Sequence, residues 1–358
     1  MSAANLLTAT LKTLATVAIG AAGGYAGYAI DMPLPWMLGS ILVVGAAGIA
    51  GISIGGHSVY VPVWLRSTMI PVLGVMLGSG FTPQVVSGMV DWWITLLALV
   101  GFIMLATAVV YQFYRRVAGF DAPTAYFCAI PGGLVEMAII GEGSGGDART
   151  ISLVHFCRIL FSVLTLPFLM RWLYHVGGGG TGGQSFSLGL EMELIDVALL
   201  GGCAIAGYFL GRAVKLPGAQ ISGPLLLSAL VHATGLTTAS PPFILIAAAQ
   251  VIAGASLASR FAGVSFRAAG KIMLASLAGT VLMLCVTFAV ALSLSTVTDE
   301  PLVALILAYA PGGVTEMSLI ALSLNVGVAF VTAHHIARIG LSVGMMPAIW
   351  RHISGRET

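Results

Sequence analysis

Charged residues are scarce in this 358-residue chain: they make up 8% of it, against about 25% in an average soluble domain. Hydrophobic residues make up 58%, and the mean hydropathy is +1.02. A chain so poor in charge does not cover a water-facing surface, which excludes a soluble enzyme, a disordered protein and a fibrous protein. The net charge of +2 is small and its carriers are scattered, so nucleic-acid binding is not expected.

Cysteine is also rare, and its spacing is not that of a metal or redox site. The sequence contains no C-x-x-C pair, no H-E-x-x-H motif and no Cys/His cluster. We expect the cysteines, which stand inside apolar runs, to be buried reduced thiols. They are Cys128, Cys157, Cys203 and Cys285. We therefore expect no enzymatic activity, no catalytic residue, no metal site and no cofactor beyond a coupling H+ or Na+.

The chain is rich in apolar runs of roughly 20 residues, the length that a helix needs to cross a bilayer. The first set of six runs lies at about 11–30, 34–53, 61–80, 92–114, 122–141 and 150–174. The second set lies at about 194–213, 218–237, 242–260, 270–295, 302–323 and 328–350. The pattern predicts an all-α integral membrane protein that crosses the membrane many times.

The two sets of runs match each other in sequence at an offset of 180 residues. Pro-Gly-Gly-Leu-Val-Glu-Met at 131–137 matches Pro-Gly-Gly-Val-Thr-Glu-Met at 311–317, and each is followed by His-x-x-Arg at the same offset. An ordered series of such matches predicts a tandem duplication. We expect a first membrane repeat over 1–175, a Gly-rich linker over 176–190 and a second membrane repeat over 191–358.

Loop charges favour opposite orientations for the two repeats. The loop after the fourth segment carries Arg115 and Arg116 in the first repeat, whereas the equivalent loop of the second carries Asp299 and Glu300. Because positive loops stay cytoplasmic, this swap is typical of an inverted-topology repeat with cytoplasmic termini. Inversion requires an odd number of crossings per repeat, so one segment in six does not cross. The alternative is twelve full crossings in parallel repeats.

The segments that contain Pro-Gly-Gly are the best candidates for the segment that does not cross the membrane in each repeat. Proline removes a helix hydrogen bond, and glycine lowers the cost of a non-helical backbone. In lipid, such a break survives only where it lines a cavity or is buried in protein. We therefore expect about ten transmembrane helices plus two broken or re-entrant elements, at 122–141 and 302–323.

Ionisable side chains inside these apolar segments are the candidate functional residues, because charge is costly within a membrane. A glutamate follows each break, and each His-x-x-Arg places its two side chains on one helix face. Half-helix N-termini and arginines favour an anionic substrate, although the glutamates offset them. The alternative is a set of buried ion pairs that hold helices together. His334, next to His335, fits packing and function equally. The candidate substrate-binding or coupling residues are Pro131, Gly132, Gly133, Glu136, His155, Arg158, Pro311, Gly312, Gly313, Glu316, His335 and Arg338.

The duplicated motifs, together with Leu-Pro-Trp-Met-Leu-Gly at 34–39, resemble the AbrB-type duplicated bacterial membrane protein family over nearly the whole chain. That family is distinct from the DNA-binding regulators of similar name. It carries the labels ammonia monooxygenase and membrane protein affecting gene expression. The residues of this chain support neither catalysis nor DNA contact, since the histidines form no evident copper site. The resemblance implies a multi-pass protein of the bacterial inner membrane.

Two functions remain in play. The first is a secondary transporter that moves a small, anionic organic solute by alternating access, coupled to protons or sodium. The second is a membrane-embedded regulator or sensor that affects gene expression indirectly; such a protein is expected to carry a partner-binding domain or a long charged tail, and this chain shows neither. The expected partners are a small-molecule substrate and the lipid bilayer, without nucleic acid, and a homo-oligomer stays open.

Overall fold

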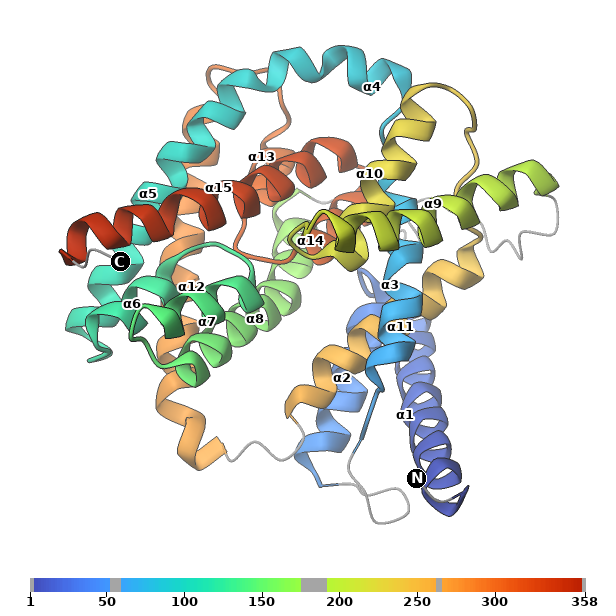
Figure 1. Cartoon of the computed structure of the whole chain (residues 1–358), viewed down its shortest axis with the longest axis horizontal. Helices are drawn as coiled ribbons and strands as arrows, with labels where there is room; N and C mark the ends of the chain where they lie inside the picture. The colour runs from blue at the N-terminus through green and yellow to red at the C-terminus, as the bar shows by residue number, and fades with distance from the viewer. Residues whose placement is uncertain (1–2, 52–58, 175–191, 262–265, 356–358) are drawn as a thin grey trace. The chain divides into compact units, whose positions relative to one another are not determined.

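A computed structural model describes residues 3–51, 59–174, 192–261 and 266–355 (Figure 1). The predicted linker, 176–190, lies outside these residues. Among the described residues there are helices and no strands, and five helices are long and apolar enough to cross a bilayer. These are Pro83–Arg116, Ala148–Tyr174, Leu194–Ala213, Gly270–Leu294 and Val328–Ser354. Together with shorter apolar helices, they confirm the predicted helical membrane protein.

The chain forms two compact units, and each unit takes segments from both predicted repeats. Unit 1 comprises Met1–Val86, Pro167–Ser265 and Leu322–Asn325. Unit 2 comprises Ser87–Leu166, Phe266–Ala321 and Val326–Thr358. The repeat boundaries along the chain stay predictions.

Unit 1 is held together by helices that approach closely at glycines. Its helices are α1 (Ala3–Ala29), α2 (Pro35–Ile49), α3 (Val63–Gly78), α9 (Leu194–Ala213), α10 (Ala219–Ala233) and α11 (Phe243–Ala258). α1 packs against α2 where Gly23 meets Gly39, and α9 packs against α10 where Gly207 meets Gly223. A Cβ atom on Gly39 or Gly223 would collide with the carbonyl oxygen of the opposite glycine. Small residues at such crossings are the usual device of membrane helix packing.

Unit 2 contains the predicted site. Its helices are α5 (Trp93–Arg116), α6 (Ala122–Ala129), α7 (Leu134–Gly143), α8 (Ala148–Tyr174), α12 (Phe266–Leu294), α13 (Leu302–Tyr309), α14 (Val314–Ser323) and α15 (Val328–Ser354), of which α8 and α14 end in unit 1. The short helix α4 (Pro83–Gly88) and the 3-10 turn η1 (Met89–Trp92) precede α5, and η2 (Ser259–Phe261) follows α11. The segments predicted to be broken are each two helices: α6 and α7, drawn in green in Figure 1, and α13 and α14, drawn in red.

Both breaks follow from local sequence. α6 begins after Asp121, whose carboxylate accepts a hydrogen bond of 2.9 Å from the Thr124 amide. It ends at Ile130, which is extended (φ −65°, ψ 129°) because a proline follows and disfavours the helical conformation. α13 ends in the same way at Ala310 (φ −59°, ψ 142°), directly before Pro311.

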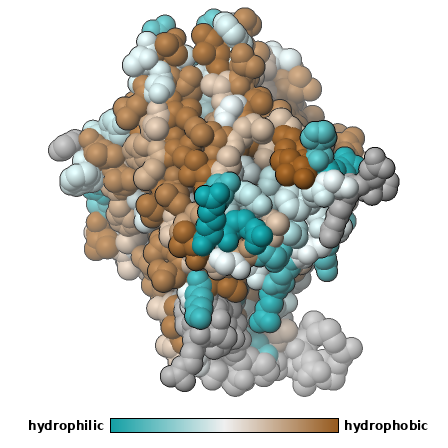
Figure 2. Space-filling view, turned by 90° about the vertical axis from the view of Figure 1, so that its left-hand side faces the viewer, coloured by the Kyte–Doolittle hydropathy of each residue, from teal (hydrophilic) through white to brown (hydrophobic). Residues whose placement is uncertain are grey.

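The surface carries large exposed apolar side chains, as a lipid-facing surface does. The face drawn in Figure 2 shows broad hydrophobic areas. On α5 and α12, for example, Leu97, Leu274 and Val281 are exposed. Cys285 is exposed as well, so the expectation of four buried thiols was wrong for this residue, which lies on the apolar helix α12; the other three are buried.

Candidate functional site

The first break is held by an arginine that caps the C-terminal end of α6. Arg158, on α8, is only 4% exposed, although its side chain is charged. Its Nη1 donates to the carbonyl of Ile130 at 3.0 Å, and its Nη2 lies 3.5 Å from the carbonyl oxygen of Gly132. The last carbonyls of a helix have no partner within the helix and carry its partial negative charge. The guanidinium therefore supplies hydrogen-bond donors to carbonyls at the end of α6 and in the break that follows it.

The second break has the same arrangement. Arg338, on α15, is 3% exposed, and its Nη1 donates to the carbonyl of Ala310, which follows α13. Its Nη2 donates to the carbonyl of Gly312 at 2.7 Å. The two arginines, which the sequence places 180 residues apart, thus bind equivalent carbonyls of the two breaks.

Each arginine is positioned by the histidine one turn earlier. Nη2 of Arg158 lies 2.8 Å from Nδ1 of His155, whose Nε2 lies 2.8 Å from the carbonyl oxygen of Phe127. Because arginine only donates, Nδ1 must accept, so Nε2 carries the hydrogen and donates to the carbonyl. His335 makes the equivalent bonds, to Arg338 at 2.9 Å and to Leu307 at 2.9 Å. Both imidazoles are therefore neutral and orient the guanidiniums.

The two glutamates lie at helix N-termini, which carry partial positive charge, whereas the arginines lie at the negative C-terminal ends of helices. The helices concerned are α7 and α14. Glu136 and Glu316 are the third residues of these helices, and both are half-buried. A Cβ atom on Gly133 would collide with Oε2 of Glu136, and one on Gly313 with Oε2 of Glu316. The carboxylates therefore fold back over the start of each helix, where the helix dipole stabilises negative charge. The carboxylates can occupy this position because the second glycine of each motif has no side chain.

The remaining motif positions are explained by packing. A Cβ atom on Gly132 would meet Cγ of Met137 at 3.1 Å, and one on Gly312 would meet Cγ of Met317 at 2.9 Å. The side chain of the methionine that ends each motif thus packs against the first glycine of that motif. Pro131 and Pro311 end the preceding helices, and both are buried.

Two serines bring the breaks side by side between α8 and α15. Ser162, one turn after Arg158, donates its hydroxyl to the carbonyl of Pro311 in the second break. Ser342, one turn after Arg338, faces the first break: its Cβ lies 3.2 Å from the position that a Cβ on Gly132 would take. Each long helix thus contacts both breaks. The sequence analysis missed these serines, although the shared pattern His-x-x-Arg-x-x-x-Ser contains them.

The four charged residues are matched to four helix ends. Arg158 and Arg338 cap the negative ends of α6 and α13, while Glu136 and Glu316 cover the positive ends of α7 and α14. The hydrogen bonds described for the guanidiniums run to backbone carbonyls and to histidines. Three buried polar atoms at the two breaks have no hydrogen-bond partner among the described residues: Nε of Arg158, Nε of Arg338 and Oγ of Ser342.

His334 belongs to a different contact. Its Nδ1 lies 2.8 Å from the carbonyl oxygen of Phe330, and its Nε2 lies 2.9 Å from Oγ1 of Thr95. Its ring lies near the rings of Trp92 and Phe330. The residue joins α15 to α5 within unit 2, which favours the packing interpretation. In the described part of the chain, no three His, Cys, Asp or Glu side chains are grouped as metal ligands.

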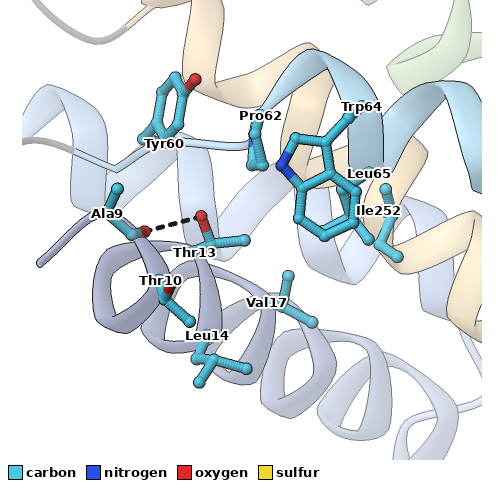
Figure 3. Close-up of a pocket in the computed structure, with 10 residues that line it drawn as sticks. All are labelled: Ala9, Thr10, Thr13, Leu14, Val17, Tyr60, Pro62, Trp64, Leu65 and Ile252. Atoms are coloured by element: carbon cyan, nitrogen blue, oxygen red, sulfur yellow. Dashed lines mark hydrogen bonds between the residues drawn. The ribbon is translucent and has the colours of Figure 1, made fainter. Parts of the chain in front are cut away.

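A cavity of about 480 Å³ lies in unit 1, and none of the predicted site residues lines it. Figure 3 shows its walls, which come from α1, the stretch before α3, the start of α3, and α11. They include Leu14, Trp64 and Ile252. The only hydrogen bond drawn there is from Oγ1 of Thr13 to the carbonyl of Ala9, at 3.0 Å, within one helix.

The comparisons with known proteins decide the family. The family model described as "Transition state regulatory protein AbrB" matches residues 36–354, which include both breaks and both arginines. This chain belongs to the AbrB family. It is 26% identical over 263 residues to "Uncharacterized protein YhjN" of Bacillus subtilis (strain 168), a match that covers 68% of this chain and 66% of that protein. This AbrB-family chain is also 23% identical over 229 residues to "Putative regulator AbrB" of Escherichia coli (strain K12), with 63% of each covered. Both matches span less than two thirds of the relative's own length.

Proposed function

We propose that this AbrB-family protein is a secondary transporter that moves a small, anionic organic solute by alternating access, coupled to protons or sodium. The observation that carries the proposal is the pair of backbone breaks that lie side by side in unit 2. Non-helical backbone at membrane depth persists where it is buried in protein or lines a cavity, and discontinuous helices recur at the substrate sites of secondary transporters. Structural ion pairing alone would not require a broken backbone.

We further propose an inverted repeat with about ten crossing helices and two broken elements. The swapped loop charges support the inversion. The equivalent contacts in the two halves support the duplication: Arg158 binds the carbonyl 28 residues before it, and so does Arg338. In such transporters one repeat-derived body rocks against another around a fixed site. The site would then change sides as the breaks are exposed alternately.

The anionic substrate follows from what the breaks offer. The helix starts of α7 and α14 present backbone N–H groups and partial positive charge, and two buried guanidiniums stand close by. Glu136 and Glu316, which cover these helix starts, are the coupling candidates. We assign the protein no enzymatic reaction and no resident cofactor, and its partners are the solute and the bilayer.

Transport in proteoliposomes tests this function. We expect the wild type to accumulate a labelled carboxylate, from a panel of butyrate, benzoate and succinate, when a pH or sodium gradient is imposed. Glu136→Gln and Glu316→Gln keep the side-chain shape and remove the titrating group, so each is expected to abolish gradient-driven accumulation and to spare solute exchange. Glu142→Gln is the matched control, since Glu142 is exposed at the far end of α7.

Accumulation by both site variants would show that these carboxylates are structural and that coupling occurs elsewhere. No movement of any solute by the wild type would instead favour the second candidate, a membrane-embedded regulator or sensor. This candidate is favoured by the names of the family model and of the Escherichia coli relative, which both describe a regulator. A regulator is expected to restore gene expression in a deletion strain even when it carries both Glu136→Gln and Glu316→Gln.

A further inference from the structure

The cavity in unit 1 is open to the surface and is lined mainly by apolar side chains (Figure 3). Leu14 and Trp64 stand on its walls and are both exposed, so the cavity is accessible from outside the protein. On its inner side, Val17 and Leu65 pack against a buried hydrophobic cluster that contains Ile252. Its volume of about 480 Å³ falls within the range of ligand pockets, roughly 300–1,000 Å³. The size and the lining of the cavity therefore suit an apolar ligand.

Two threonine hydroxyls beside the cavity are engaged by the backbone. Oγ1 of Thr13 donates to the carbonyl of Ala9 at 3.0 Å, within α1. Oγ1 of Thr16 accepts a hydrogen bond of 3.1 Å from the amide of Tyr60, which holds the stretch before α3 against α1. A ligand in the cavity is therefore expected to be held mainly by van der Waals contacts with the apolar walls.

The cavity follows the first part of two helices, which places it toward one end of unit 1. Along α1, its wall extends from Ala9 to Val17, a rise of about 12 Å. Tyr60 and Trp64, whose side chains are exposed, stand on either side of the residue that begins α3, Val63. Tyrosine and tryptophan are enriched where a bilayer meets water. We therefore expect the cavity to extend from this interface into the hydrocarbon.

Positively charged side chains gather at the same end of unit 1. Lys12 directly precedes Thr13 on α1, and Arg66 directly follows Leu65 on α3; both side chains are half-buried. Arg260, in η2, lies close enough to Arg66 for their two positive charges to repel each other. An anionic group beside these side chains would be attracted to them and would reduce this repulsion.

The acidic side chains in the described part of unit 1 lie away from the cavity. They are Asp31, Glu193 and Asp196. Asp31 follows the opposite end of α1 and forms an ion pair of 2.8 Å with Arg171. The other two stand at the start of α9, the helix whose Leu200 packs against Val75 near the end of α3. The charge around the cavity is therefore complementary to an anion.

We infer that this cavity binds an acyl chain of an anionic phospholipid from the surrounding bilayer, with the phosphate of the headgroup beside Lys12 and Arg66. An acyl chain matches the apolar walls, and the bilayer supplies it directly to a cavity that opens among exposed apolar side chains. The negative headgroup matches the basic end of unit 1. A zwitterionic phospholipid has the same chains but also a positive group, which the two cations repel. The bound lipid would join α1 to the start of α3, and this role does not depend on the proposed transport function.

Fluorescence of Trp64 reports directly on the occupant, because this side chain lines the cavity. The test uses the full chain in detergent micelles, with the other tryptophans replaced by phenylalanine. Phosphatidylglycerol or phosphatidylcholine with brominated acyl chains, which quench tryptophan on contact, is then titrated. We expect saturable quenching, with phosphatidylglycerol about tenfold tighter than phosphatidylcholine. The matched control retains only Trp172, which is exposed on α8 and does not line the cavity; we expect the two lipids to quench it equally and without saturation.

Two sets of variants separate the chain-binding and headgroup-binding parts of the site. Val17→Phe places a larger side chain in the cavity and is expected to weaken the quenching of Trp64 by both lipids about tenfold. Val197→Phe, at an exposed position on α9 outside the cavity, is the control. Lys12→Gln combined with Arg66→Gln is expected to abolish the preference for phosphatidylglycerol and to retain binding of phosphatidylcholine.

Native mass spectrometry of the unmodified protein supplies a measurement that needs no substitution. We expect one phosphatidylglycerol molecule to stay bound to each chain under conditions that remove phosphatidylcholine. This result tests the inference even if a variant does not fold.

Four outcomes would overturn the inference. They are quenching of Trp64 that does not saturate, equal affinity for the two lipids, full quenching in Val17→Phe, and quenching by 1-bromododecane that is as tight as quenching by the lipid. The last outcome would assign the cavity to a small apolar solute. Loss of lipid quenching as the protein self-associates would instead assign this face to a second copy of the chain and would also overturn the inference.

Discussion

At the scale of single residues, the buried arginines act as helix caps, because their guanidiniums donate to backbone carbonyls at the ends of α6 and α13. Arg158 reaches two carbonyls and a histidine at once because its guanidinium is a planar fork of donors. A lysine has one compact ammonium group and does not cover the same set. The partial negative charge at the end of α6 stabilises the positive charge of the guanidinium.

Arg158→Lys is therefore expected to lower the free energy of unfolding by about 2–4 kcal/mol, because buried carbonyls lose their donor. Thermal unfolding of the purified protein in detergent measures the change. Arg149→Lys is the matched control on the same helix, since Arg149 is exposed, and it is expected to unfold within a degree or so of the wild type. Equal melting temperatures for the two variants would contradict the capping role.

At the scale of helices, glycine sets how closely pairs pack in unit 1. α1 and α2, like α9 and α10, meet where both helices have a glycine and therefore no side chain. The sequence shows these glycines but does not show which helices meet at them. Glycine in a membrane helix occurs both at close helix crossings and at breaks of the helix, so its presence alone does not identify a crossing.

Gly223→Ala is expected to destabilise the protein by about 1–3 kcal/mol, because the added methyl group would collide with the carbonyl of Gly207. The control is Gly202→Ala on α9, where no atom lies within 4 Å of the new Cβ and the better helix propensity of alanine applies. Thermal unfolding of both variants checks the prediction, and a stable Gly223→Ala protein would argue against this close crossing.

At the scale of the whole molecule, the proposed alternating access depends on how the two halves are oriented across the membrane. Their loops carry opposite charge at equivalent positions, Arg116 in the first half and Glu300 in the second. If the repeats are inverted, these loops face opposite sides of the membrane.

Arg116→Cys and Glu300→Cys, each introduced into a cysteine-free background, are therefore expected to react with a membrane-impermeant thiol reagent from opposite sides. The measurement compares labelling in intact cells with labelling in inverted vesicles. Labelling of both positions from the same side would remove the inverted repeat and favour twelve parallel crossings.

The sequence by itself determined the features that depend on neighbours along the chain. Proline fixes its own backbone and restricts the residue before it, so the ends of α6 and α13 were predictable from Pro131 and Pro311. The i, i+3 spacing placed His155 and Arg158 on one face for the same local reason. The apolar runs likewise predicted the helices, since their lengths are set by the bilayer.

Only the tertiary structure decided what those side chains bind. Arg158 caps carbonyls 26–30 residues away, and Ser162 reaches a break 149 residues further along the chain. No local pattern specifies such partners, because any buried carbonyl or carboxylate would satisfy a guanidinium equally well in the sequence. The same holds for the contrast between Ser162 and Ser342, which are identical in pattern and differ only in what packs against them. That difference arises from the packing of α8 and α15 around the two breaks.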